Sequence, residues 1–160
     1  MSNTIQKLTA KDLMTTRLIT LNPETDVFRA IEVLNKNNIS GAPVIDEKRN
    51  LLGMFTEKSA LEVLIDAAYE GLPTNQVGSF MSEPADTISE NTQLLTIVQV
   101  FLNKRTRRLP VVKDGKLIGQ VSRRDILKTA IKIIKATNDR GKTLLYLSAL
   151  RDMQEVPVVD

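Results

Sequence analysis

The sequence predicts an α+β fold built from two copies of one β-α-β-β-α unit, packed together with pseudo-twofold symmetry. The observation behind this prediction is an internal repeat in which a methionine, a proline and a glycine recur: Met14 and Met81, Pro43 and Pro110, and Gly53 and Gly119. The first two pairs lie 67 positions apart and the third lies 66 apart. Such a period indicates two supersecondary units that bury their apolar faces against each other.

The first unit is expected to occupy residues 1–70, including a polar lead-in. In chain order we expect a helical turn over residues 11–14, a strand over 17–21, a helix from 22–25 to 38, strands over 43–45 and 51–55, and a helix over 56–69. The first long helix follows from the i, i+3, i+4, i+7 spacing of its apolar residues, and the two strands flank a polar turn as in a hairpin.

The second unit, residues 77–137, follows a linker at 71–76 that contains the helix breakers Gly71 and Pro73. We expect a helical turn over residues 77–81, a strand over 86–88, a helix from about 91, strands over 109–112 and 116–121, and a helix over 122–136. Asp114 and Gly115 suit the tight turn of the hairpin. Residues 138–160 form a tail outside the repeat, with a short helix expected over 143–153.

The composition excludes several classes of function. The chain has 160 residues, a net charge of +3, and neither histidine nor cysteine. Ser-His-Asp and Cys-His catalysis and Cys/His zinc sites are therefore excluded, and we expect no enzyme activity. The absence of tryptophan and a content of only 4% aromatic residues argue against nucleic acid as a partner, because few side chains can stack on bases. Without a long apolar run or a signal peptide, the protein is expected in the cytoplasm, away from membranes.

The last helix of each unit carries apolar residues over more than one face. Ile126, Leu127 and Ile131 illustrate this in the second unit, and Leu64 and Ile65 in the first. One face of each helix can pack on its own sheet. We expect a second subunit to cover the rest, giving a homodimer. The alternative is that the other repeat covers it.

Ser122 to Asp125 carry the strongest functional signal. Ser122 followed three residues later by Asp125 is a variant of the capping box, which can begin a helix without any ligand. Arg123 and Arg124 would then occupy the first helical turn, where cations are unfavourable and anions bind well. Four more cations precede the neighbouring strand, so that six basic side chains are expected to converge at one end of the sheet: Arg123 and Arg124 with Lys104, Arg105, Arg107 and Arg108. A carboxylate beside arginines suits a ribose and a phosphate; the alternative is a solvated basic surface.

The repeat from about residue 12 to residue 134 resembles a tandem pair of cystathionine β-synthase (CBS) domains, or Bateman module. The resemblance rests on four segments: Leu13-Met14, Ala42-Pro43-Val44-Ile45-Asp46, Leu109-Pro110-Val111-Val112, and Gly119-x-Val121-Ser122-x-x-Asp125. It implies a regulatory module that binds AMP, ADP or ATP, or an S-adenosyl compound such as S-adenosylmethionine, between the repeats. It also implies a regulated partner protein, which the sequence does not name.

The resemblance also implies which residues form the site. Ser122 and Asp125 would hold the ribose, Arg124 would contact a phosphate, and Ser40 and Gly41 would leave room for a base. The complete set of implied ligand-binding residues is Thr16, Leu18, Ile19, Ile39, Ser40, Gly41, Ala42, Arg107, Arg108, Gln120, Ser122, Arg124 and Asp125.

The first copy departs from this pattern, because Ser59 stands where the ribose aspartate belongs and Arg107 and Arg108 face that site. We therefore expect one nucleotide per chain. Two other readings remain open: a structural dimerisation module with empty cavities, and nucleic-acid binding through the basic loop. Residues 136–143 also match a relaxed phosphate-loop pattern, but they follow a helix instead of a strand.

Overall fold

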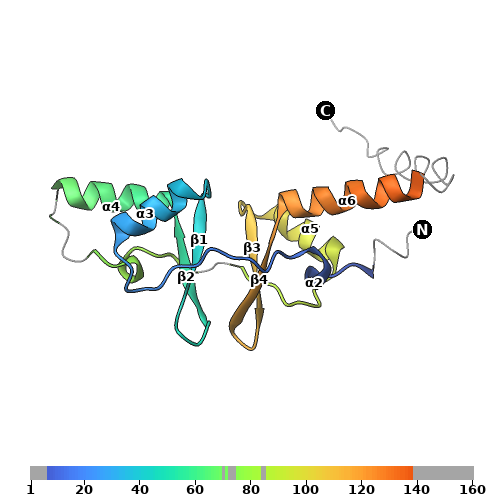
Figure 1. The fold of residues 1–160 in the computed structure, drawn as a ribbon, viewed down its shortest axis with the longest axis horizontal. Helices are drawn as coiled ribbons and strands as arrows, with labels where there is room; N and C mark the ends of the chain where they lie inside the picture. Colours follow the sequence, from blue (N-terminus) through green and yellow to red (C-terminus); the bar gives the residue numbers. More distant parts are fainter. Residues whose placement is uncertain (1–6, 70, 72–74, 84–85, 139–160) are drawn as a thin grey trace.

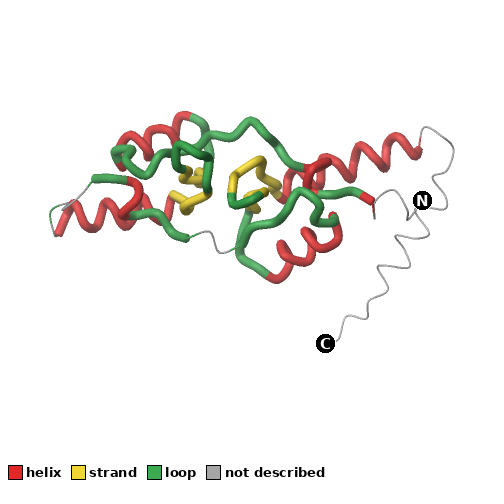
Figure 2. Tube along the Cα trace, turned by 90° about the horizontal axis from the view of Figure 1, so that it is seen from below, coloured by secondary structure: helices red, strands yellow, loops and turns green. Residues whose placement is uncertain are grey.

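A computed structural model describes residues 7–69, 71, 75–83 and 86–138. Two β-hairpins lie side by side at the centre, and each has its helices on the side away from the other hairpin (Figures 1 and 2). The expected tail over 138–160, with its helix over 143–153, falls outside the described residues apart from residue 138. The same is true of most of the phosphate-loop pattern at 136–143.

The first repeat contains α3 (Val27–Lys36), β1 (Gly41–Ile45), β2 (Leu51–Thr56) and α4 (Glu57–Tyr69). The helix α3 begins later than the sequence predicts. Residues 22–25 form a turn, and the Asp26 carboxylate instead accepts hydrogen bonds from the backbone nitrogens of Phe28 and Arg29 at 2.9 and 3.1 Å. An acidic N-cap of this kind satisfies two amides that the helix leaves without a partner.

The second repeat contains α5 (Leu94–Asn103), β3 (Arg108–Lys113), β4 (Lys116–Ser122) and α6 (Arg123–Asn138). Its hairpin turns at Asp114 and Gly115, whose φ angles are 51° and 77°. Positive φ at both central residues matches the twist of the flanking strands, so this predicted turn is confirmed.

The short element that precedes each repeat packs on the opposite repeat. The helix α2 (Ala10–Leu13) buries Ala10 and Leu13 in the core of the second repeat, and the 3₁₀ helix η1 (Val77–Ser79) buries Val77 in the core of the first. Hydrogen bonds fix both contacts: the amide of Ala10 donates to the carbonyl of Thr92 at 2.8 Å, and the amide of Val77 to that of Thr25 at 2.9 Å. The chain therefore crosses between the repeats after α2, as Figure 1 shows.

The repeated methionines and glycines meet at these crossings. Met14 lies against Gly119, and Met81 against Gly53. A Cβ on Gly53 would come within 2.8 Å of the Met81 Sδ and 2.6 Å of the Ser82 carbonyl oxygen. Glycine is therefore required at both positions by close packing and not by a special backbone angle.

The prediction of a strand at the start of each unit, over residues 17–21 and 86–88, is wrong. Residues 17–21 contribute one bridge, between Leu21 and Val44, and residues 86–88 one bridge, between Ile88 and Val111. Each sheet consequently has two strands, β1–β2 and β3–β4. The predicted segments lie beside their hairpins but pair with them at a single residue.

Candidate functional site between the repeats

The two hairpins face each other, and each contributes the side chains of one cross-strand pair to the space between them. Cross-strand partners project from the same side of a hairpin. Pro43 pairs with Met54 in the first hairpin, and Pro110 pairs with Gln120 in the second. At the far end the hairpin turns join, because the amide of Leu117 donates to the carbonyl of Arg49 at 2.9 Å. The opposite end opens into two cavities.

The cavity beside Ser122, called the Ser122 cavity below, has a volume of about 550 Å³. This size lies within the range of small-molecule sites. Its lining comes from both repeats and includes Asn38, Ile39, Ser40, Glu57, Arg107, Arg108, Ser122, Arg123 and Arg124. It therefore joins the start of α6 to the segment before β1.

Asp125 and Ser122 form a reciprocal cap at the start of α6. The Oδ2 atom of Asp125 accepts hydrogen bonds from the backbone nitrogen and the hydroxyl of Ser122, at 2.8 and 2.6 Å. The amide of Asp125 donates back to the Ser122 hydroxyl oxygen at 3.1 Å. Among the described residues the Oδ1 atom has no hydrogen-bond partner, and the side chain is half-buried. The carboxylate thus begins the helix with one oxygen and keeps the other free.

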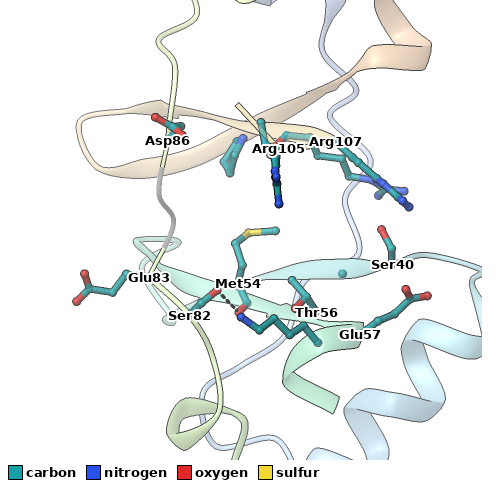
Figure 3. Close-up of a pocket in the computed structure, with 14 residues that line it drawn as sticks. Ser40, Met54, Thr56, Glu57, Ser82, Glu83, Asp86, Arg105 and Arg107 are labelled. Carbon is teal, nitrogen blue, oxygen red and sulfur yellow. Dashed lines mark hydrogen bonds between the residues drawn. The ribbon is translucent and has the colours of Figure 1, made fainter. Parts of the chain in front are cut away.

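The second cavity, called the Met54 cavity below, occupies the pseudo-symmetric position and has a volume of about 460 Å³. Met54 projects from β2, and Arg105 and Arg107 reach toward the first repeat from the loop before β3 (Figure 3). Ser59, which replaces the ribose aspartate here, is buried and bonds only weakly to Thr56, at 3.3 Å. The cavity therefore exists, but it lacks a carboxylate equivalent to Asp125.

The expected cluster of six cations divides in the structure. Lys104 forms a salt bridge of 2.9 Å with Asp86. Arg123 turns back toward α5, where it donates to the carbonyl of Phe101 at 3.1 Å and lies 5.9 Å from the centre of the Phe101 ring. The ammonium group of Lys104 and the guanidinium group of Arg123 are therefore both engaged within the protein.

Four cations of the cluster remain available around the cavities. Within the described part of the chain, no salt bridge engages Arg105, Arg107, Arg108 or Arg124. Arg107 and Arg108 line both cavities, Arg124 lines only the Ser122 cavity, and Arg105 only the Met54 cavity. The free cations are therefore shared between two adjoining spaces.

The structure brings together six of the residues that the resemblance implied. These six, which line the Ser122 cavity, are Ile39, Ser40, Arg107, Arg108, Ser122 and Arg124. Gly41 lines the Met54 cavity, and Asp125 lies one helical turn after Ser122. Ala42 is instead fully buried in the core of the first repeat.

The remaining implied residues lie at the edge of the second hairpin or in the crossing segment. Gln120 is 5% exposed, and its backbone pairs with Thr15 through two hydrogen bonds of 3.0 Å. Thr16 and Ile19 are exposed and Leu18 is half-buried, all in the segment that crosses between the repeats. They do not line either of the two cavities.

Sequence reasoning missed Glu57 and Asn38 as lining residues. Glu57 begins α4 and adds a negative charge to both cavities. Its position in the repeat matches that of Arg123, so an alignment of the two copies would have found it. Nothing in the sequence pattern singles out Asn38.

The described residues contain no group of three or more His, Cys, Asp or Glu side chains that could hold a metal ion. Among the same residues, no helix combines the length and the apolar character that crossing a bilayer requires.

The CBS domain family model matches the chain twice, at residues 10–66 and 77–132. The chain therefore belongs to the CBS domain family and carries a tandem pair of these domains. The predicted resemblance and the α+β fold are both confirmed.

Solved structures and curated relatives agree with this assignment. A crystal structure of CBSX2 in complex with AMP is 31% identical, with a TM-score of 0.69, and covers 78% of this chain and 97% of that one. A CBS domain-containing protein of Dictyostelium discoideum is 31% identical over 139 residues, which are 81% of this chain and 95% of that protein. A Methanocaldococcus jannaschii protein is 25% identical over 118 residues, and the chain spans only 41% of its length.

Proposed function

We propose that this chain is a regulatory module that binds one adenine nucleotide, AMP, ADP or ATP, in the Ser122 cavity. The observation that carries the proposal is the placement of the Asp125–Ser122 pair beside a cavity lined by Arg107, Arg108 and Arg124. A free carboxylate oxygen can accept hydrogen bonds from ribose hydroxyls, and guanidinium groups bind phosphate. The similarity to CBSX2, whose structure contains AMP, supports the same ligand class.

The Ser122 cavity is favoured over the Met54 cavity because only the former has an aspartate, Asp125, paired with the hydroxyl residue at its helix start; Ser59 stands at the equivalent position of the first repeat. A hydroxyl at Ser59 carries no charge and is buried. We therefore propose one nucleotide per chain. Absence of enzyme activity and a cytoplasmic location stay predictions of the sequence.

Binding would regulate a partner protein by changing how the two repeats are arranged relative to each other. Residues on both repeats line the cavity, so a ligand that fits one arrangement better than another changes their populations.

A thermal-shift series on the full chain tests the proposal with AMP, ADP, ATP and S-adenosylmethionine. A ligand at about 100 times its Kd adds roughly 2.7 kcal/mol to the stability. For a chain of this size that corresponds to an increase of roughly 5–10 °C in Tm. A rise with at least one adenine nucleotide supports the proposal; no rise with any of the four would favour a structural dimerisation module.

A homodimer is the proposed assembly, and exposed apolar side chains on α4 and α6 support it. Leu64 and Ile65 are 54% and 61% exposed, and Leu127 and Ile131 are 66% and 50% exposed. The other repeat therefore does not cover them. Substituting Leu127→Glu should convert a dimer to a monomer in light scattering coupled to size-exclusion chromatography. A wild-type monomer at micromolar concentration would contradict the dimer.

A further inference from the structure

The last helix of each repeat, α4 or α6, has an exposed apolar strip along its length. Leu61 and Ile65 belong to the strip of α4, and Leu127 and Ile131 belong to the strip of α6. These residues are equivalent in the repeat, because 66 positions separate Leu61 from Leu127 and Ile65 from Ile131, the same offset as between the repeated glycines. The two strips are therefore copies of one surface.

Charged side chains of opposite sign border the two strips. Glu62 and Asp66, one helical turn apart, stand beside the strip of α4. The positions equivalent to them on α6, again 66 residues later, hold Lys128 and Lys132. Asp66 is half-buried and the other three are exposed, and no salt bridge engages any of the four within the described part of the chain. All four charges are therefore available to another molecule.

The two repeats differ in net charge in the same sense as their last helices. Residues 1–70 contain 8 Lys and Arg and 10 Asp and Glu, which gives −2, and residues 77–137 contain 11 and 5, which gives +6. The two helices lie at opposite ends of the molecule, with both hairpins between them (Figures 1 and 2). One chain thus presents a strip with negative neighbours at one end and a strip with positive neighbours at the other.

We propose that two copies of the chain associate head to tail, so that α4 of each copy packs on α6 of the other; this inference rests on the homodimer proposed above. Burial of the apolar strips drives the association, and the charges beside them select the orientation. A twofold axis makes the contact occur twice, because the surface that α4 offers to one α6 is offered again by the second copy. Each dimer therefore covers all four strips.

The head-to-head arrangement is disfavoured by charge. In that arrangement α4 would pack on α4 and α6 on α6, so the lysines beside the two α6 strips would lie together. The two second repeats, each with a charge of +6, would also lie together. Like charges brought together at an interface are unfavourable and suppress the wrong arrangement.

A second copy accounts for both strips at once, which an anionic lipid surface does not. The apolar strip of α6 with its lysines would suit such a surface by itself. The strip of α4 would be repelled, because Glu62 and Asp66 stand beside it. Equivalent strips with opposite charges are the pattern expected when each strip serves as the partner of the other.

Disulfide trapping in the full chain tests the orientation, because the chain has no cysteine of its own. Ile65→Cys places a thiol on the strip of α4, and Ile131→Cys places one at the equivalent position of α6. In a head-to-tail dimer each variant alone keeps its two thiols at opposite ends, so oxidation should not join its subunits. A mixture of the two variants, one with a longer affinity tag, should give the mixed disulfide dimer on a non-reducing gel. Each variant joining to itself as readily as to the other would overturn the inference.

Charge reversal gives a second readout that does not depend on thiol geometry. Lys128→Glu with Lys132→Glu should weaken the dimer roughly 10-fold in analytical ultracentrifugation, because attraction to Glu62 and Asp66 becomes repulsion. Adding Glu62→Lys and Asp66→Lys to the same chain should restore the wild-type Kd. In a head-to-head dimer the two reversed α6 helices would repel each other just as the lysines did, so an unchanged Kd in the first variant would overturn the inference.

The matched control changes the same charge away from both helices. Lys48 and Lys116 are exposed residues of the two hairpins, and Lys48→Glu with Lys116→Glu should leave the Kd of the dimer unchanged. A loss in this control equal to that of the α6 variant would overturn the inference, because net charge alone would then explain both. A wild-type chain that stays monomeric would instead refute the proposed homodimer, and a different protein would then have to cover the strips.

Discussion

The Oδ2 atom of Asp125 lies 2.6 Å from the hydroxyl oxygen of Ser122, which is the shortest contact in the cap of α6. The corresponding pair in the first repeat, Ser59 and Thr56, is separated by 3.3 Å. The two repeats therefore begin their last helices with the same residue spacing but with a tighter pair in the second. Only in the second does the residue three after the helix-start hydroxyl carry a carboxylate, whose Oδ1 has no partner among the described residues.

This difference predicts unequal effects of two matched substitutions. Asp125→Ala should weaken AMP binding by roughly 1.5–3 kcal/mol, the usual worth of a hydrogen bond to a charged group. Ser59→Ala should leave AMP binding unchanged in the same calorimetric titration. Because Asp125 also caps α6, the variant should lose about 1 kcal/mol of stability, which thermal unfolding would record. A loss in Ser59→Ala as large as that in Asp125→Ala would contradict the choice of the Ser122 cavity as the single site.

A second pair of variants distinguishes the cavities by their arginines. Arg124 lines only the Ser122 cavity and Arg105 only the Met54 cavity; both side chains are exposed, and neither forms a salt bridge with any residue that the structure describes. Arg124→Gln should weaken AMP binding by roughly 1 kcal/mol, about fivefold, because it removes a charge-assisted contact to phosphate. Arg105→Gln removes the same charge from the chain and should have little effect. The reverse order in fluorescence titrations would place the phosphate beside Arg105.

The contact between Met14 and Gly119 predicts a stability effect that is independent of any ligand. Gly119→Ala would place a Cβ against the Sδ and Cγ atoms of Met14. Overpacking of this kind typically costs about 1–3 kcal/mol. In a Met14→Ala background the same substitution should cost much less, because the clashing atoms are gone. Additive effects of the two substitutions in urea unfolding would contradict the proposed packing.

The salt bridge between Glu90 and Lys113 predicts a pH dependence of stability. Lys113 donates a hydrogen bond of 2.7 Å to the Glu90 carboxylate, and this one bond lowers the pKa of Glu90 below its usual 4.5 and raises the pKa of Lys113 above its usual 10.5. A lowered carboxyl pKa stabilises the fold above 4.5 and loses this contribution as the pH falls through the folded-state pKa. A raised lysine pKa stabilises below 10.5 and loses its contribution at higher pH.

The Tm of the wild type should therefore exceed that of Glu90→Gln near neutral pH. The difference should shrink below pH 4.5 and above pH 10.5. Both side chains reach solvent, so added salt should reduce the difference as well. A difference that stays constant across these pH values would show that the ion pair does not cause it.

Local signals in the sequence predicted the hairpins and the last helices well. Asp114 and Gly115 mark a turn because both must adopt positive φ, and Ser122 with Asp125 marks a helix start. These features depend on neighbours within four residues. For that reason they can be read without knowledge of the tertiary fold.

The packing of the segment that precedes each repeat on the opposite repeat could not be predicted from the same local signals. The repeat places Met14 at the start of the first unit, but its side chain packs on Gly119 of the second. Residues 17–21 have the composition of a strand, yet they cross between two hairpins and bond to the first only at Leu21. Which partner such a segment meets depends on the arrangement of the repeats, and sequence periodicity carries no information about it.

The sequence predicted which residues surround the candidate site better than it predicted the contacts that these residues make. The basic loop before β3 was expected to converge with the start of α6, but Asp86 and the carbonyl of Phe101 engage Lys104 and Arg123. Such pairings between distant segments require coordinates. The buried Nε2 atom of Gln120, which has no hydrogen-bond partner among the described residues, likewise became visible only in the structure.

A crystal structure of the full chain grown with saturating AMP tests the central claim most directly. We predict one AMP per chain, with its ribose at Asp125 and Ser122 and its phosphate at Arg124. AMP bound only in the Met54 cavity, or no AMP in either cavity at saturating concentration, would contradict the account.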